Sequence, residues 1–488
     1  MTDLSGLNPE RGVVIAGRRR KGGSGLFDVD DPATGAHLAA VADGDRRDAL
    51  AAVDAAAAAF DPWRRTPGRT RSEVLRRVFE LMVRDADRLA GLIAAENGKS
   101  LADARGEVVY AAEFFRWFAE EAARSGGSYG PSPAGGTRTL VTERPVGVAA
   151  LVTPWNFPAA MAARKIAPAL AAGCTVVLKP AAETPLTAIA LLDLLAEAGV
   201  PDGVVNLVPT TDPAGVVEAW LADPRVRKIS FTGSTRVGQL LLRRAADRIV
   251  NASMELGGNA PFVVTEDADL EAAVDGAMVA KFRGGGQACT AANRFYVHQE
   301  VVERFTALLG ARLEALAVGP ASAGSDIGPL ISAKAVGTVG GLVDRAVAAG
   351  AWITHRAPVP SDGYFYPPTA LRLPDSASVP TTEILGTEIF GPVAPIVAWT
   401  DEDAMLRDAN ASELGLAAYV YAGDLARAVR IGEELEAGMI GVNRGLVSDP
   451  SAPFGGMKQS GIGREGARVG LEEFTETQYL SVDWPNGR

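Results

Sequence analysis

One segment in the second half of the chain combines a reactive residue type with a permissive backbone. Residues 281–294 read KFRGGGQACTAANR and contain Cys289, one of only two cysteines among 488 residues. A thiol attacks a substrate only as the thiolate, so a cysteine catalyst needs surroundings that stabilise this form. The glycines before Cys289 let the backbone approach a substrate closely. The segment predicts a cysteine nucleophile, although a small buried cysteine beside a flexible turn would have the same local sequence.

Two further residues could assist such a nucleophile. Glu255 closes the alternating segment 250–256, where it shares one face with Asn251 and Ser253, and it could activate water as a general base. Asn156 stands in PWNFP (154–158), where two prolines fix the backbone, and its amide could donate to an oxyanion. The alternatives are an ordinary surface glutamate and a rigid turn.

Two other positions could bind an anionic cofactor. Ser234, in FTGST (231–235), opens a helix that contains Gly238, and the free N–H groups of a helix start attract a pyrophosphate. Lys179 ends CTVVLK (174–179), where its amine could meet a ribose or a phosphate. Because the first string is not GxGxxG, a plain capped turn remains possible there, and Lys179 could simply reach solvent.

The residues around these positions predict an α/β protein. Residues 13–41 favour short strands, 45–123 favour helices that we expect to be scaffold, and 125–136 (SGGSYGPSPAGG) has the composition of a linker. From 146 to 246 strands alternate with helices, which is typical of a parallel sheet covered on both faces. Ligands of such sheets bind beyond the carboxyl ends of the strands, where these candidate residues stand.

The amino-acid composition excludes several classes of binding partner. The net charge of −11 and a single basic run, Arg18 to Lys21, argue against nucleic acid. No segment is apolar enough to span a bilayer, and the first residues lack the apolar core of a signal peptide, so we expect no membrane association. Two cysteines form no disulfide framework, which predicts a cytoplasmic location. Three scattered histidines give no reason to expect a metal site.

Taken together, seven strings in this order resemble the aldehyde dehydrogenase superfamily over essentially the whole chain. They are PWNFP (154–158), KPAAETP (179–185), FTGSTRVG (231–238), MELGGNAP (254–261), GQACTAANR (286–294), EIFGPV (388–393) and PFGGMKQSGIGREG (453–466).

The resemblance implies an α/β architecture with three parts. Residues 1–131 and 147–257 would form a Rossmann-type NAD(P)-binding domain, and 258–444 an α/β catalytic domain. Residues 132–146 and 475–488 would form a small bridging hairpin of a homodimer or homotetramer, and 445–474 would return to the active site and the cofactor domain.

The resemblance also assigns roles. It implies Cys289 as nucleophile, Glu255 as general base, and the Asn156 side chain with the Cys289 N–H as oxyanion hole. It implies a cofactor site of NAD or NADP made of Trp155, Lys179, Ala182, Gly233, Ser234, Gly238, Leu256, Glu388 and Phe390. Related enzymes often have glutamate at the position of Ala182, where it binds the adenine ribose; here glutamate comes one residue later, at Glu183. Losing that carboxylate, with Lys179 nearby, makes NADP plausible.

Within the superfamily the strings are most similar to the branch that oxidises succinate semialdehyde. Arg164, Arg283 and Ser448 match that branch's contacts to the substrate carboxylate, and Phe454 would line the same site. Two guanidinium groups can clamp a carboxylate, although each arginine could instead form an internal ion pair.

Other activities stay open at this point. The substrate could be glutarate semialdehyde, an aminoaldehyde or a broad range of aliphatic aldehydes. An enzyme that transfers the acyl group to coenzyme A is a further alternative, although Glu255 favours hydrolysis. The last alternative is a binding protein without catalysis, against which the complete set Cys289, Glu255 and Asn156 argues.

Overall fold

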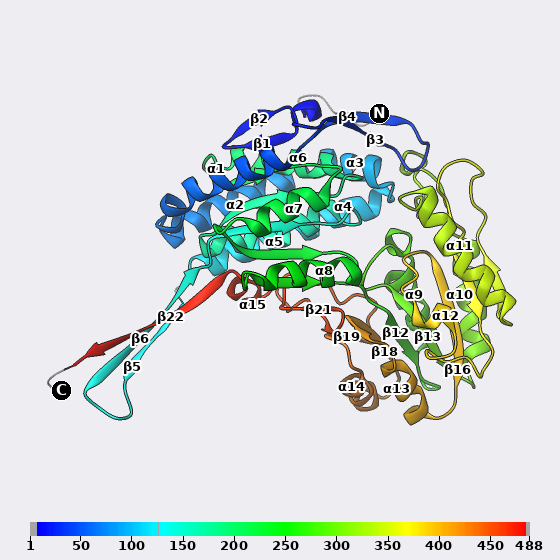
Figure 1. Cartoon of the computed structure of the whole chain (residues 1–488). Helices are drawn as coiled ribbons and strands as arrows, with labels where there is room; N and C mark the ends of the chain where they lie inside the picture. The colour runs from blue at the N-terminus through cyan, green and yellow to red at the C-terminus, as the bar shows by residue number, and fades with distance from the viewer. Residues whose placement is uncertain (1–6, 125, 485–488) are drawn as a thin grey trace.

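Two largely parallel sheets and a projecting arm make up the molecule (Figure 1). The computed structural model describes residues 7–124 and 126–484. The α/β fold predicted from the alternation of strands and helices is confirmed.

The first sheet contains the strands that precede most of the candidate residues. Its strands from β9 to β11 are parallel, and β1 and β21 pair antiparallel at the two ends of this run. In spatial order the sheet consists of β2 (Arg18–Arg20), β1 (Val13–Ile15), β9 (Val205–Leu207), β8 (Thr175–Lys179), β7 (Val148–Val152), β10 (Val226–Thr232), β11 (Asn251–Glu255) and β21 (Gly461–Ile462).

Helices bury both faces of this sheet. Along β7, Ala149 and Leu151 belong to one hydrophobic cluster, whereas Val148, Ala150 and Val152 belong to another, because alternate side chains point to opposite faces. The first cluster includes residues of α2 (Gly68–Arg84), α3 (Ala86–Asn97), α4 (Leu101–Ala122), α5 (Pro158–Ala172) and α6 (Pro185–Glu197). The second includes residues of α1 (Arg46–Arg64), α7 (Pro213–Ala222) and α8 (Thr235–Ala246).

The second sheet is built in the same way. Its strands are β14 (Trp352–Arg356), β15 (Thr369–Arg372), β16 (Val393–Trp399), β13 (Ala292–His298), β12 (Ala260–Val264), β18 (Ala417–Tyr421) and β19 (Met439–Val442), all parallel except β14. One face packs against α9 (Leu270–Ala277) and α10 (Val302–Glu314). The other packs against α11 (Ala333–Ala348), α12 (Glu383–Gly386), α13 (Glu402–Asn410) and α14 (Leu425–Glu434).

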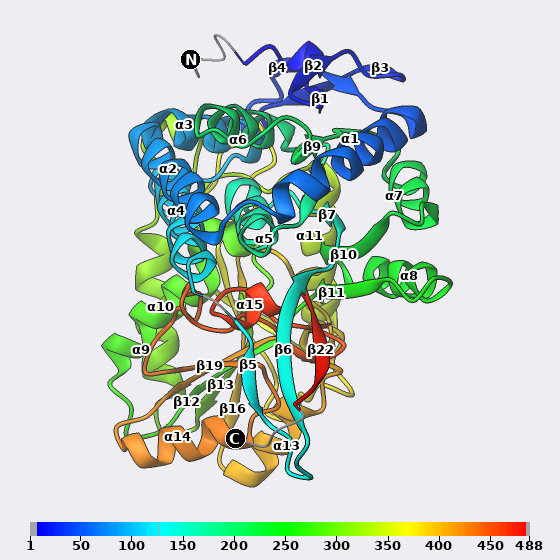
Figure 2. The same ribbon diagram turned by 90° about the vertical axis from the view of Figure 1, so that its left-hand side faces the viewer.

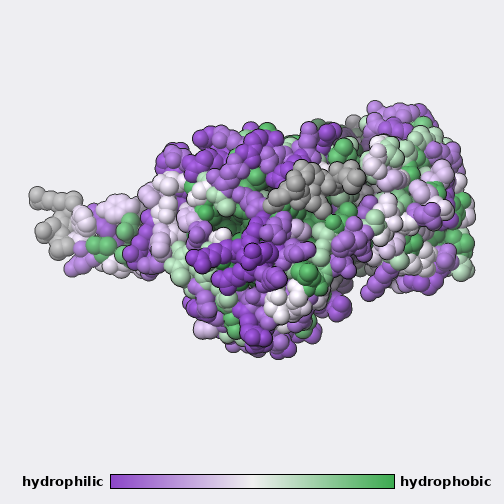
Figure 3. Space-filling model, turned by 90° about the horizontal axis from the view of Figure 1, so that it is seen from above, coloured by the Kyte–Doolittle hydropathy of each residue, from purple (hydrophilic) through white to green (hydrophobic). Residues whose placement is uncertain are grey.

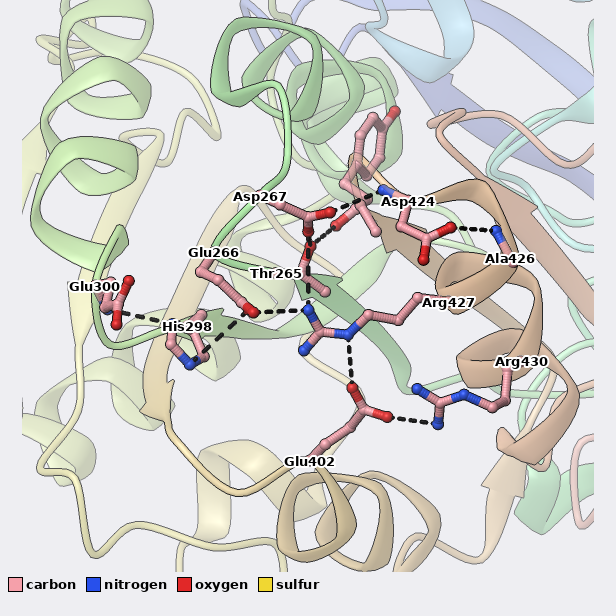
Figure 4. A network of polar contacts seen from close by, with 12 residues as sticks. Thr265, Glu266, Asp267, His298, Glu300, Glu402, Asp424, Ala426, Arg427 and Arg430 are labelled. Carbon is pink, nitrogen blue, oxygen red and sulfur yellow. Dashed lines mark hydrogen bonds and ion pairs between the residues drawn. The ribbon is translucent and has the colours of Figure 1, made fainter.

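The carboxyl edge of this second sheet is occupied by ion pairs (Figure 4). Arg427 of α14 binds Glu266, which follows β12, at 2.7 Å and Glu402 of α13 at 2.9 Å. His298, at the end of β13, lies 3.9 Å from Glu266. Charged side chains of the protein itself therefore occupy the carboxyl edge of this sheet, which is the edge at which parallel sheets usually bind a ligand.

The arm is a three-stranded antiparallel sheet that extends away from both larger sheets (Figure 1), and its strands β5, β6 and β22 lie side by side in Figure 2. β6 (Thr137–Pro145) pairs along its whole length with β22 (Thr475–Asp483), and β5 (Ser128–Pro131) pairs on its other side. The arm therefore begins before residue 132, and the prediction of a linker at 125–136 is wrong for Ser128–Pro131. The glycine-rich and proline-rich composition of residues 125–136 does not predict a strand, and β5 forms because it is hydrogen-bonded to β6.

Small elements complete the description. They are the pair β3 (Gly25–Asp30) and β4 (His37–Asp43), the pair β17 (Leu414–Gly415) and β20 (Met457–Lys458), the short helices η1 (Pro9–Arg11), η4 (Ala321–Ala323) and α15 (Val469–Glu472), and the turns η2 and η3 described below. Within the described part of the chain, no helix has both the length and the apolar character needed to cross a membrane.

Two buried glutamates join the N-terminal helices to α5 and α6, which cover the first sheet. Glu107 of α4 accepts hydrogen bonds from the N–H groups of Ala159 and Ala160, at 2.8 and 3.2 Å, in the first turn of α5. It also pairs with Lys99 at 2.6 Å, and both side chains are almost wholly buried. Glu96 of α3 accepts in the same way from Leu186 and Thr187 in the first turn of α6. Acceptor oxygens are favourable at these positions because helix N-termini carry unpaired N–H groups. Burial nevertheless raises the pKa of Glu96 to about 8, against the hydrogen bonds that lower it.

Removing Glu107 should therefore destabilise the fold strongly. We expect E107A to lower the melting temperature by roughly 5 °C or more, because the variant leaves the buried Lys99 without its acidic partner, which typically costs about 3–5 kcal/mol. The measurement is a thermal melt followed by circular dichroism. E80A, which removes an exposed partner of Arg76 on α2, is the control and should shift the melting temperature by no more than about 1 °C. Equal melting temperatures for the two variants would contradict this role of Glu107.

Candidate active site

The candidate residues meet where the two sheets adjoin. β7, β8, β10 and β11 of the first sheet present their carboxyl ends there, and β12 and β13 of the second sheet present their amino ends. Glu255 ends β11, and β12 begins only a few residues later, at Ala260. Cys289 precedes β13, so the predicted nucleophile comes from the amino edge of a sheet and not from a carboxyl edge, where ligands of parallel sheets usually bind.

Three glycines shape the loop that carries Cys289. After the π-helical turn η2 (Met278–Phe282), the short turn η3 (Arg283–Gly286) contains Gly284, Gly285 and Gly286 with φ of 60°, 65° and 72°. This left-handed region is costly for residues with a Cβ atom. The Asp103 carboxylate accepts a hydrogen bond of 2.8 Å from the Gly284 N–H. The half-buried Cys289 follows this turn in a fixed backbone.

The loop with Asn156 touches the nucleophile loop directly. The Asn156 side-chain amide donates a hydrogen bond of 2.9 Å to the carbonyl of Gln287, two residues before Cys289. An amide nitrogen carries two hydrogens, so one remains for another acceptor. Pro158 begins α5 at the first helical position, where proline is well tolerated. Asn156 and Cys289 thus approach each other from different sheets.

Residues at the end of α3 and just after it hold the Asn156 loop, although the helical pattern of 45–123 predicted only scaffold there. Asn97 donates to the carbonyl of Trp155 at 3.1 Å, and Lys99 donates to the carbonyl of Asn156 at 2.7 Å. The polar string Glu96-Asn97-Gly98-Lys99 interrupts an otherwise amphipathic helical region. That interruption was the available signal of a role beyond scaffold.

Glu255 lies buried beside the same seam. It is 2% exposed, and neither carboxylate oxygen has a hydrogen-bond partner among the described residues. Burial raises its pKa well above the usual value, and Glu465 raises it further, against the opposing charges of Arg164 and Lys165. Gly258 follows closely, and a Cβ atom there would lie 2.0 Å from the Cys289 carbonyl oxygen. The Glu255 strand end and the nucleophile are therefore in close backbone contact.

The Cys289 thiol faces a cavity of about 260 Å³. All four residues predicted to bind the substrate line this cavity together with Cys289, namely Arg164, Arg283, Ser448 and Phe454. Phe454 reaches it because residues 453–466 fold back on themselves, with paired backbone hydrogen bonds of 2.7 Å between Phe454 and Glu465. Burial raises the pKa of the Cys289 thiol to about 12, although Arg164 lowers it.

The two arginines of the cavity differ in their partners. Arg164 is fully buried, pairs with Glu465, and lies 4.2 Å from the ring centroid of Phe454. Its Nη2 atom is buried without a hydrogen-bond partner among the described residues. Arg283 lies 5.6 Å from the Phe157 ring centroid and has no acidic partner in the described part of the chain. The alternative of an internal ion pair therefore applies to Arg164 and not to Arg283.

A second cavity, of about 590 Å³, lies at the carboxyl ends of β7, β8 and β10. Its lining includes three residues predicted to bind the cofactor, Lys179, Ala182 and Gly233. The Lys179 amine donates to the Pro180 carbonyl at 2.8 Å, and burial lowers its pKa to about 8 against the charge of Glu183. The buried hydroxyl of Thr232 also lines this cavity and has no hydrogen-bond partner among the described residues.

The other predicted cofactor residues lie outside the lining of both cavities. Ser234 is the N-cap of α8, and its side chain makes no capping hydrogen bond, so the first N–H groups of the helix have no side-chain cap. Gly238 has a packing role: a Cβ atom there would lie 2.4 Å from a methyl group of Leu256, so glycine lets α8 approach the end of β11.

Glu388 and Phe390 lie close to Trp155 and the Glu255 strand end. Glu388 accepts a hydrogen bond of 3.1 Å from the Gly258 N–H, and burial raises its pKa to about 7. The Phe390 ring meets Trp155 edge to face, with centroids 5.5 Å apart, and its φ of 52° is unusual for a residue with a side chain. The second cavity, the uncapped start of α8 and the pair of Trp155 and Phe390 are suited in shape and chemistry to a dinucleotide.

Comparison with known proteins agrees with this geometry. The model of the aldehyde dehydrogenase family matches residues 19–480. A succinate-semialdehyde dehydrogenase of Paenarthrobacter nicotinovorans is 51% identical over 92% of this chain and 99% of its own. A probable succinate-semialdehyde dehydrogenase [NADP(+)] of Sinorhizobium fredii is 46% identical over 96% and 94%. The crystal structure of succinate-semialdehyde dehydrogenase from Burkholderia pseudomallei superposes with a TM-score of 0.94, at 44% identity over 97% and 98% of the two chains.

The agreement extends over the two sheets, the arm and the loops that meet at Cys289. This chain belongs to the aldehyde dehydrogenase family.

Proposed function

We propose that this protein oxidises succinate semialdehyde to succinate, with NAD or NADP as hydride acceptor, through a thioester on Cys289. The observation that carries the choice of substrate is Arg283, a cation without an acidic partner that lines the same cavity as the nucleophile. The relatives reported above are named succinate-semialdehyde dehydrogenases, which supports the proposal.

The substrate would bind with its carboxylate toward the arginines. Arg283 and the free Nη2 atom of Arg164 supply N–H donors, and Ser448 supplies a hydroxyl. Charge-assisted hydrogen bonds to a carboxylate are stronger than neutral ones. An aminoaldehyde would bring a cation toward these guanidinium groups, so like-charge repulsion disfavours it.

The Cys289 thiolate would then attack the aldehyde carbon. The developing oxyanion would be stabilised by the remaining amide hydrogen of Asn156 and by the Cys289 N–H. When bound, the nicotinamide cofactor supplies the acceptor for the hydride, and loss of that hydride leaves a thioester on Cys289. Lys179, Ala182, Gly233, Ser234, Gly238 and Leu256 would hold the adenosine and pyrophosphate, and Trp155, Glu388 and Phe390 the nicotinamide end.

Glu255 would complete the reaction as general base. Its raised pKa makes its carboxylate a stronger proton acceptor, because burial disfavours the charged form. It would take a proton from water that attacks the thioester and releases succinate. Ala182 and Lys179 in the second cavity leave room for a 2′-phosphate, and the NADP(+) in the name of the Sinorhizobium relative supports use of NADP.

The proposal extends to the oligomeric state of the protein and to its location in the cell. The arm exposes Tyr129, Leu140, Tyr479, Leu480 and Val482, and the space-filling view shows hydrophobic colour on this projection (Figure 3). An exposed strand edge with apolar side chains favours pairing with a second copy, so we propose a homodimer or homotetramer. A cytoplasmic location remains a prediction from the cysteine content.

The substrate proposal is tested with a variant of Arg283. We expect R283A to lower the ratio of kcat/KM for succinate semialdehyde to that for butanal by about 10- to 100-fold, because a hydrogen bond to a charged group is lost. Initial rates with NAD and with NADP, for wild type and variant, give this ratio and the cofactor preference. R312A removes an exposed arginine paired with Asp275 and should leave the ratio unchanged. Preference of the wild type for butanal, or for glutarate semialdehyde, would refute the proposed substrate.

The role of Glu255 is tested by E255Q. We expect a rapid burst of reduced cofactor equal to the active sites, followed by turnover slowed about 10²- to 10⁴-fold, because acylation no longer leads to fast hydrolysis. Stopped-flow absorbance and mass spectrometry of the acylated Cys289 measure both phases. Slow turnover without a burst would assign Glu255 to an earlier step.

The state of the nucleophile is tested by alkylation at different pH. Because the pKa of Cys289 is raised to about 12, the thiolate fraction should rise about tenfold per pH unit, and labelling by iodoacetamide should still be accelerating at about pH 9. C174S serves as the control, since it leaves Cys289 as the one remaining cysteine. A rate that is constant above neutral pH would show that the thiol is already ionised there.

A further inference from the structure

A buried hydroxyl without a partner lines the substrate cavity. Tyr110 of α4 lines the same cavity as Cys289, Arg164 and Arg283, and its hydroxyl has no hydrogen-bond partner among the described residues. The ring packs edge to face against Phe114, with centroids 4.9 Å apart and planes at 73°. A buried polar group without a partner is unfavourable for folding, so its retention calls for an explanation.

Arg164 presents a second donor without a partner in the same neighbourhood. Its Nη2 atom is buried and makes no hydrogen bond with the described residues. Burial raises the pKa of Tyr110, and the charge of Arg164 opposes this change, so the two groups lie within electrostatic reach of each other. The phenol oxygen can accept from a guanidinium N–H of Arg164, but the phenol hydrogen still needs an acceptor, and a guanidinium group offers none.

The acidic residues in and near the cavity already have partners of their own. Asp103 accepts from the Gly284 N–H, and Glu107 binds Lys99 and the first turn of α5. Glu465 pairs with Arg164 through one oxygen and with Lys165 through the other. A molecule that enters the cavity with a carboxylate can therefore supply an acceptor for the Tyr110 hydroxyl and for Arg164 Nη2.

We propose that the Tyr110 hydroxyl donates a hydrogen bond to the terminal carboxylate of the substrate, beside Arg164 and Arg283, and so helps to select aldehydes that end in an anion. This inference rests on the proposed function. It adds an uncharged hydrogen-bond donor, Tyr110, to the two arginines of the substrate cavity. A neutral aldehyde of the same length leaves this hydroxyl without an acceptor, so the hydroxyl should improve binding of the charged substrate alone.

The test compares Y110F with the wild type. We expect the ratio of kcat/KM for succinate semialdehyde to that for butanal to fall at least about tenfold in Y110F, mainly through a higher KM for succinate semialdehyde. The melting temperature should stay the same or rise, because the lost hydroxyl had no partner in the folded chain. As a second readout, succinate should stabilise the wild type against thermal unfolding more than it stabilises Y110F.

Y364F provides the matched control. Tyr364 is half-buried and lies outside the lining of both cavities, so removing its hydroxyl should change neither the substrate ratio nor the effect of succinate. An unchanged ratio in Y110F would overturn the inference. A lower melting temperature of Y110F with equal losses on both aldehydes would also overturn it, because that pattern indicates a structural role. A wild type without preference for succinate semialdehyde would instead refute the proposed function itself.

Discussion

The buried Lys99–Glu107 ion pair is the interaction on which the geometry of the site depends. Glu107 binds the first turn of α5, and Lys99 binds the carbonyl of Asn156 just before that helix. Two charges in the interior are tolerated only when each has a full set of partners. Because these partners are backbone groups of the Asn156 loop and of the helix that follows it, the stability of the pair and the position of the Asn156 side chain are coupled.

The same rule organises the rest of the seam between the sheets. Glu465 balances Arg164 and Lys165, and Asp103 holds the glycine turn before Cys289. Charged side chains with partners fix loops that have little apolar surface of their own. The groups left without partners are fewer, and among the described residues they include both oxygens of Glu255 and the Tyr110 hydroxyl. These are the positions at which a reacting molecule would supply the missing partner.

Much of this arrangement could be predicted from the sequence, and the exceptions have physical reasons. Strand and helix alternation predicted the first sheet, since local periodicity determines which faces are buried. The resemblance named Arg164 and Arg283, but only the fold reveals that Glu465 pairs with the former. Ser128–Pro131 was predicted as a linker because its strand is held by backbone hydrogen bonds to β6, and such bonds do not depend on the amino-acid composition of the strand. Asn97, Lys99 and Tyr110 escaped notice because helical periodicity cannot distinguish a core position from a cavity wall.

The contrast between the two arginines has a consequence for how such a protein can diversify. Arg164 is locked in place, since replacing it would leave Glu465 with one partner fewer in the interior. No acidic residue of the described chain depends on Arg283, so mutation at that position changes the chemistry of the cavity with little penalty to folding. New substrate ranges are therefore most accessible to evolution through Arg283, while Arg164 stays under strong purifying constraint.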